Sequence, residues 1–105
     1  MVVQKNWGKE ILLLEEDSHN VKGLWLQKGK QHHLKYHNAK TETLFVVRGT
    51  GFMIRNGLFH EIEEGQCYTI LPRIIHKVWA SIKEDLVLLE VNCPSLEESV
   101  CLEID

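Results

Sequence analysis

The sequence predicts an all-β protein, a barrel or sandwich formed by one domain that spans residues 1–105. Short apolar runs of strand length recur along almost the whole chain, and turn residues separate them. One separation is an Asn-Gly pair, which is typical of a tight β-hairpin. A length of 105 residues, with 44% apolar and 26% charged residues, suits one hydrophobic core and is too short for two.

The strands follow from the apolar runs and the residues that bound them. Between the predicted strands 52–55 and 58–62, Asn56-Gly57 readily takes the positive φ angles of a type I′ turn, which predicts a hairpin. After Pro94 the tail 95–105 turns acidic, and we expect an edge strand, a short helix or a frayed end. Glycines at three further strand boundaries permit tight bends between two sheets: Gly29, Gly49 and Gly65. The predicted strands are 10–15, 21–27, 33–37, 44–48, 52–55, 58–62, 68–71, 77–80 and 86–92.

Composition excludes several classes of function. The net charge of -3 and the scattered Lys and Arg residues give no basic stripe for nucleic acid. Residues 1–9 lack the apolar region of a secretion signal, and no apolar run reaches the length of a membrane span, so we expect a cytoplasmic protein. Cys67, Cys93 and Cys101 form no metal or redox motif, and we expect reduced thiols.

Polar residues that can carry chemistry cluster in the middle of the chain. Lys35 and His37 alternate along a predicted strand and therefore share one face. Glu42 follows His37 after a short gap, so two neighbouring strands could aim both side chains at one point. A second block supplies Arg73 and His76.

The spacing of these residues resembles the two motifs of the cupin family. The first motif is a glycine, five residues, His-x-His, four residues, Glu, six residues and a glycine. Gly65 and His76 match the glycine and histidine of the second motif, after an interval of fifteen residues that suits a short hairpin. The resemblance covers about half of the chain and implies a double-stranded β-helix, or jelly-roll barrel. The residues on the first motif are Gly29, Lys35, His37, Glu42 and Gly49.

The resemblance implies a metal site with one ligand replaced. Lys35 stands where the family has its first histidine, and an ammonium has no lone pair for a metal. The implied ligands are therefore His37, Glu42 and His76, a set that suits Zn, Mn, Fe or Ni and leaves positions open for water or substrate. The alternative is a cupin pocket that is dry or binds its ligand without a metal.

The chain ends resemble the cupin module of mannose-6-phosphate isomerases and mannose-1-phosphate guanylyltransferases. Trp7 and the neighbouring residues 8–10, and the segment 89–91 before the acidic tail, carry this likeness. It implies aldose–ketose isomerisation of a sugar or sugar phosphate, in which Lys35 would hold an anionic group or stabilise an oxyanion. The chain departs from the pattern at Asn6, where those proteins have proline, and in the tail, which lacks their arginine.

Other residues have simpler interpretations. His33 lies on the same face of the predicted strand as Lys35 and His37 and is expected at the pocket rim. His33 and Arg73 are candidates for substrate binding. We also expect a homodimer. Three functions stay open: a sugar or sugar-phosphate isomerase or epimerase, a non-haem Fe(II) dioxygenase, and a non-catalytic small-molecule-binding module. Five aromatic residues are expected in the core: Trp25, Phe45, Phe52, Phe59 and Trp79.

Overall fold

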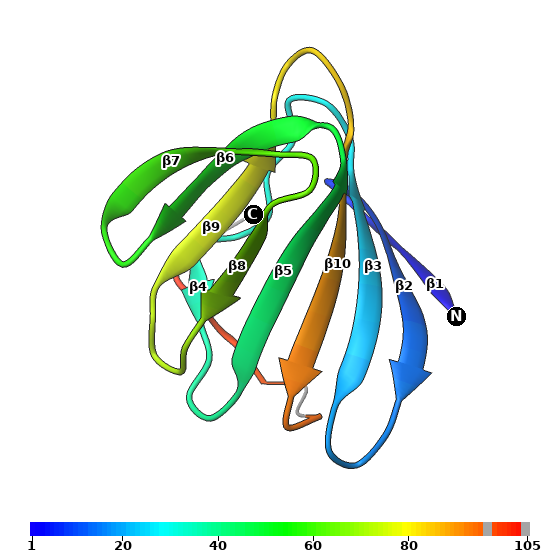
Figure 1. Ribbon diagram of the computed structural model, residues 1–105, viewed down its shortest axis with the longest axis vertical. Coiled ribbons are helices and arrows are strands. Elements are labelled where there is room, and N and C mark those ends of the chain that lie inside the picture. The colour runs from blue at the N-terminus through cyan, green and yellow to red at the C-terminus, as the bar shows by residue number, and fades with distance from the viewer. Residues whose placement is uncertain (96–97, 104–105) are drawn as a thin grey trace.

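The strands form two antiparallel sheets that face each other (Figure 1). The computed structural model describes residues 1–95 and 98–103. The described residues contain no helix, so none of them forms a helix that could cross a membrane. The six-stranded sheet has the order β1 (Val2–Lys5), β2 (Gly8–Glu15), β3 (Asn20–Leu26), β10 (Leu86–Cys93), β5 (Thr41–Arg48) and β8 (Cys67–Ile70). The five-stranded sheet has the order β11 (Val100–Cys101), β4 (Lys35–Tyr36), β9 (His76–Ala80), β6 (Thr50–Arg55) and β7 (Leu58–Glu63).

The core lies between the sheets and follows the two-residue period of the strands. In β3, for example, every second residue is buried, as expected for a strand with one face toward a core. The inward row of β3 changes from Leu24 and Leu26 to the polar Asn20 and Lys22 at one end. One end of the barrel interior is therefore apolar and the other is polar. The apolar core consists of Trp7, Leu24, Leu26, Leu44, Val46, Met53, Ile62, Ile70, Val78, Ala80, Leu86 and Leu88.

Glycine geometry explains two of the tight connections. Asn56 and Gly57 have φ angles of 53° and 79° and join β6 to β7 directly, which confirms the predicted type I′ hairpin. Gly49 has a φ angle of 93°, and a Cβ at this position would lie 2.1 Å from the backbone oxygen of Asp85. Only glycine permits this close approach between the end of β5 and the start of β10.

The structure differs from the predicted strands at the chain ends and around the metal motif. Strand β1 was not predicted, and the predicted strand 33–37 shortens to Lys35–Tyr36 because positions 32–34 are irregular. Within the tail, Val100–Cys101 forms an edge strand against β4, one of the predicted outcomes. Tail positions 96–97 and 104–105 lie outside the described residues. The three cysteines are free thiols, and all are exposed.

The aromatic residues correct the prediction of an aromatic core. Phe45 and Phe59 are 41% and 59% exposed, and Phe52, Phe59 and Trp79 pack on one another with ring centroids 5.6–5.7 Å apart. They alternate with the buried inward residues of their strands and therefore cover the outer faces of the sheets. The alternation was predicted correctly, but alternation alone does not identify which face is buried.

Candidate metal centre

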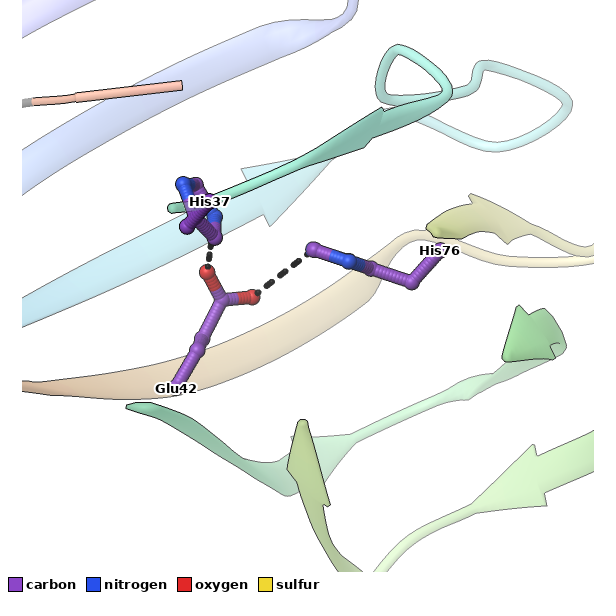
Figure 2. A group of neighbouring side chains, drawn as sticks. All are labelled: His37, Glu42 and His76. Carbon is purple, nitrogen blue, oxygen red and sulfur yellow. Dashed lines mark hydrogen bonds and ion pairs between the residues drawn. The ribbon is translucent and has the colours of Figure 1, made fainter. Parts of the chain in front are cut away.

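Three buried side chains converge at the polar end of the barrel (Figure 2). His37 follows β4, Glu42 lies in β5, and His76 begins β9; their side chains approach one another from both sheets. The three are only 3%, 2% and 1% exposed, and one ligand atom from each lies within 4.8 Å of the others. His37 Nε2 lies 3.0 Å from Glu42 Oε2, and His76 Nε2 lies 3.6 Å from Glu42 Oε1. The structure thus brings together the three predicted ligands.

Hydrogen bonds set the orientation of both imidazole rings. The Nδ1–H of His37 donates to the backbone oxygen of Glu98 at 2.6 Å, and the Nδ1–H of His76 donates to that of Ile74 at 2.9 Å. A carbonyl oxygen can only accept, so each Nδ1 carries a proton, and Nε2 is the nitrogen of each ring that a metal ion could bind. His76 Nε2 is buried and has no hydrogen-bond partner among the described residues. Rings fixed through one nitrogen, with the other turned toward a shared point, are typical of metal ligands.

Glu42 supplies the negative charge of the group. Burial alone would raise the pKa of Glu42, but the hydrogen bond from His37, the nearby ring of His76 and the charge of Lys35 hold that pKa well below its ordinary value. Glu42 is therefore a carboxylate at neutral pH. A proton on His37 Nε2 can bridge to this carboxylate when no metal is bound, and a metal ion would take the place of that proton.

The residues fit a divalent cation. Two imidazole nitrogens and one carboxylate oxygen suit Zn, Mn, Fe(II) or Ni. Two ligand atoms that each lie about 2.0–2.2 Å from one ion, at octahedral or tetrahedral angles, are roughly 3–3.6 Å apart. His37 Nε2 lies 3.0 Å from Glu42 Oε2 and His76 Nε2 lies 3.6 Å from Glu42 Oε1, and the three ligand atoms lie within 4.8 Å of one another, so small side-chain movements would close the group around an ion. The group could therefore hold a metal ion, which would act there as a Lewis acid.

A polar pocket of about 540 Å³ opens beside His37. Lys35 borders it, and its charge acts on Glu42, Glu90 and the ring of His32. The chain carries a net charge of -3, yet four of its nine lysines line this one pocket. Three glutamates line the same pocket, and Glu10 lies 3.7 Å from Lys22, so the four lysines leave a small excess of positive charge toward an anionic ligand. The four are Lys5, Lys22, Lys35 and Lys40.

Glu90 adds a buried acid to the pocket wall. It is 5% exposed, lies opposite Lys22 in the pairing of β10 with β3, and accepts a hydrogen bond from Asn92 Nδ2 at 2.8 Å. Burial and the negative charge of Glu42 raise its pKa, and the neighbouring lysines oppose this effect. Glu90 therefore holds a proton more readily than an exposed glutamate.

Both histidines before β4 line the pocket, His33 as expected for a rim residue, and His32 reaches deeper into the barrel. His33 lines the pocket mouth, whereas His32 lines the inner cavity with Glu42 and His76 and packs edge-on against Trp7 at a centroid distance of 4.8 Å. Burial, followed by the charge of Lys35, lowers the pKa of His32 well below its usual value. His32 can border both the pocket and the inner cavity because positions 32–34 are not an extended strand.

Arg73 lies apart from the lysine-lined pocket. Its exposed side chain borders a separate hollow with Tyr36, Asn38 and Ile75. Its backbone has a φ angle of 67°, and its N–H donates to the backbone oxygen of His37 at 2.6 Å. The contact with the candidate metal centre is therefore made by the backbone of Arg73.

Sequence reasoning missed most of the charged residues of the pocket, among them Lys22, Lys40 and Glu90. Two of them could have been found from the two-residue period of the strands. Lys22 lies on the same face of β3 as Leu24, and Glu90 lies on the same face of β10 as Leu88. A charged residue in register with an inward apolar row is a candidate for a functional site.

Comparison with known proteins shows the family. A family model described as ectoine synthase matches residues 1–101. The chain belongs to the ectoine synthase family. This corrects the predicted membership of the mannose-6-phosphate isomerase branch, while the predicted cupin fold is confirmed. None of the curated protein sequences matches this family member significantly.

Solved structures similar to this ectoine synthase family member are cupins. A cupin-2 domain protein from Rhodospirillum rubrum has a TM-score of 0.85 at 12% identity, over 98% of this chain and 74% of that one. An RmlC-like cupin from Shewanella frigidimarina has a TM-score of 0.82 at 16% identity, over 92% and 86% of the two chains. A putative sugar phosphate isomerase from Acidithiobacillus ferrooxidans has a TM-score of 0.69 at 18% identity, over 78% and 53%. At these identities the likeness shows the fold alone.

Proposed function

We propose that this protein is a metal-dependent enzyme that acts on a small anionic molecule. The observation that carries the proposal is the orientation of the two histidines: each Nδ1 is tied to a backbone carbonyl, and each Nε2 faces the carboxylate of Glu42. Membership of the ectoine synthase family makes ectoine synthesis the first reaction to test. The pocket lysines favour an anionic substrate and make isomerisation of a sugar phosphate the second candidate.

The residues have distinct roles in this proposal. His37, Glu42 and His76 would hold the cation, which when bound supplies a Lewis acid for a substrate oxygen. The pocket lysines orient an anionic group, and Lys35 stabilises negative charge that develops next to the metal ligands. The buried carboxyl of Glu90, whose pKa is raised, gives or accepts a proton at the pocket wall.

Metal content tests the first part of the proposal. Elemental analysis of the purified protein should find a near-stoichiometric divalent metal, and the His37→Ala, His76→Ala double variant should lose it. His19→Ala is a matched control, because His19 lies in the turn before β3 and hydrogen-bonds to Ser18. A parent that takes up no Zn, Mn, Fe(II) or Ni on dialysis would contradict a metal enzyme and favour a binding module without metal.

Ligand binding distinguishes the candidate reactions. The metal-loaded protein is melted with ectoine or with mannose 6-phosphate, because a ligand of the native state raises the melting temperature. A shift with ectoine supports the family reaction, and a shift with the sugar phosphate supports the second candidate. Oxygen consumption by the Fe(II)-loaded protein in the presence of a ligand would instead indicate a dioxygenase.

We also propose a homodimer that buries the outer face of the six-stranded sheet. The outward positions of β10 and β5 carry no charged residue from Val87 to Cys93 or from Thr41 to Val47, so two copies can meet without opposed like charges. Light scattering should show a dimer that Phe45→Glu dissociates, while Phe59→Glu on the other sheet does not. The exposed apolar side chains of this face are Leu13 (56%), Phe45 (41%), Val47 (39%) and Val91 (37%).

A further inference from the structure

We propose that residues 98–103, here called the clasp, position His37 for metal binding, with Glu103 as their anchor. The inference rests on the proposed metal centre and adds a positioning device to it. The clasp lies about 60 residues after His37 in sequence, yet it contacts both the strand before His37 and the turn after it. It supplies no metal ligand and acts through the ring of His37.

Strand β4 depends on the clasp for most of its pairing. It contains only Lys35 and Tyr36, and its pairing with β9 is limited to Lys35 opposite His76. On its other side Val100 and Cys101 pair with both of its residues. The N–H of Leu102 extends this contact by donating to the backbone oxygen of Leu34 at 2.8 Å. The strand that delivers His37 is therefore held between β9 and the clasp.

Glu103 fixes the far end of the clasp to both neighbouring strands. One carboxylate oxygen accepts the N–H of Leu34 at 2.7 Å, and the other accepts a hydrogen bond from Lys77 Nζ at 2.7 Å. Lys77 directly follows the ligand His76 in β9. One carboxylate thus ties the strands of two proposed ligands together.

Glu98 holds the other end of the clasp against His37 itself. Its backbone oxygen accepts the Nδ1–H of His37 at 2.6 Å, and its side chain accepts the N–H of Ala39 at 2.6 Å. If the clasp leaves β4, the ring of His37 loses the acceptor that fixes its rotation and keeps Nε2 turned toward Glu42. Loss of such an outer partner typically weakens metal binding about 10–100-fold.

Two substitutions loosen the clasp without touching a metal ligand. Leu102→Pro removes the N–H that donates to Leu34 and changes a side chain that is 46% exposed, and Leu102→Ala keeps the N–H as its control. Glu103→Gln removes the charge that pairs with Lys77, and Glu64→Gln in an exposed turn is its control. Each protein is measured for Zn affinity by chelator competition, for metal-free melting temperature, and for the Nδ1–H resonance of His37 in ¹⁵N spectra without metal.

If the clasp positions His37, loosening it should weaken metal binding and change the fold little. Leu102→Pro should weaken Zn binding about tenfold and Glu103→Gln about threefold, while both controls and the metal-free melting temperatures stay near the parent. The Nδ1–H resonance of His37 should be protected in the parent and exchange rapidly in Leu102→Pro. Unchanged protection and unchanged affinity in Leu102→Pro would overturn the clasp. A parent with a protected Nδ1–H that binds no metal would contradict the proposed metal centre alone, because the resonance reports the positioning of His37 without metal.

Discussion

Replacing Glu42 by glutamine separates metal binding from folding at the candidate centre. Glu42→Gln keeps the size of the side chain and removes its charge. The amide can donate to a neutral histidine Nε2, so the buried hydrogen bonds of the metal-free protein can be kept. The variant should lose at least about 100-fold in Zn affinity, more than is typical for an outer partner, because an amide oxygen replaces the only anionic ligand.

The metal-free stability of the same variant should lose part of its acid dependence. The folded-state pKa of Glu42 lies well below the unfolded value of 4.5, so its contribution is fully present above that value and is lost as the pH falls through the folded pKa. Each unit of that depression corresponds to about 1.4 kcal/mol. The parent should therefore lose more stability than Glu42→Gln between about pH 5 and 3.

Chelator competition at pH 7 and urea unfolding at several pH values measure these two effects. Glu64→Gln is the matched control, since it makes the same change in an exposed turn. Zn affinity in Glu42→Gln equal to that of the parent would refute the assignment of Glu42 as a ligand. A parallel loss of stability with acid in both proteins would refute the depressed pKa.

Three further predictions concern the pocket, the fold and the metal. Lys35→Met should reduce turnover about tenfold or more with its metal content unchanged, whereas Lys28→Met, outside the pocket, should not; an unchanged rate in steady-state kinetics would remove Lys35 from the mechanism. Gly49→Ala should cost about 3 kcal/mol or more because its Cβ meets Asp85, whereas Gly57→Ala should cost only about 1 kcal/mol, since it has open space and a positive φ; equal midpoints in urea would contradict this. Removing the metal with a chelator should lower the melting temperature, and re-adding it at about 1,000 times its Kd should restore about 4 kcal/mol of stability by calorimetry.

The parts of the fold that depend on local chemistry could be predicted from sequence. Asn56-Gly57 specifies its own turn, so the turn of the β6–β7 hairpin was predicted correctly and the ends of its strands to within two residues. The spacing from His37 to Glu42 and His76 was also sufficient to propose that these side chains meet. Both features depend on residues near in sequence or on the resemblance to cupin motifs.

The parts that depend on distant pairing could not be predicted. The alternation of β10 places Glu90 on the inward face, but its position opposite Lys22 depends on the pairing of β10 with β3, about 70 residues earlier, and no local pattern specifies this partner. The same holds for Glu98, whose contact with His37 depends on an edge strand of two residues. His32 enters the cavity because the chain departs from strand geometry before β4. In each case the tertiary structure, rather than local propensity, sets the neighbours of the side chain.

Replacement of a cupin ligand by Lys35 changes what the site can bind. The substituted position keeps its place beside the metal ligands, but it contributes a positive charge where the family motif has a neutral imidazole. A metal ion held by His37, Glu42 and His76 would place a second positive charge nearby, and the charge of Glu42 alone would not balance both. Burial and the charge of Glu42 raise the pKa of Glu90 while Lys35 lowers it, so the charge of this buried carboxyl is sensitive to the cations around it. The proposed anionic substrate would add negative charge to the same site, beside the lysines and the buried acid that line the pocket.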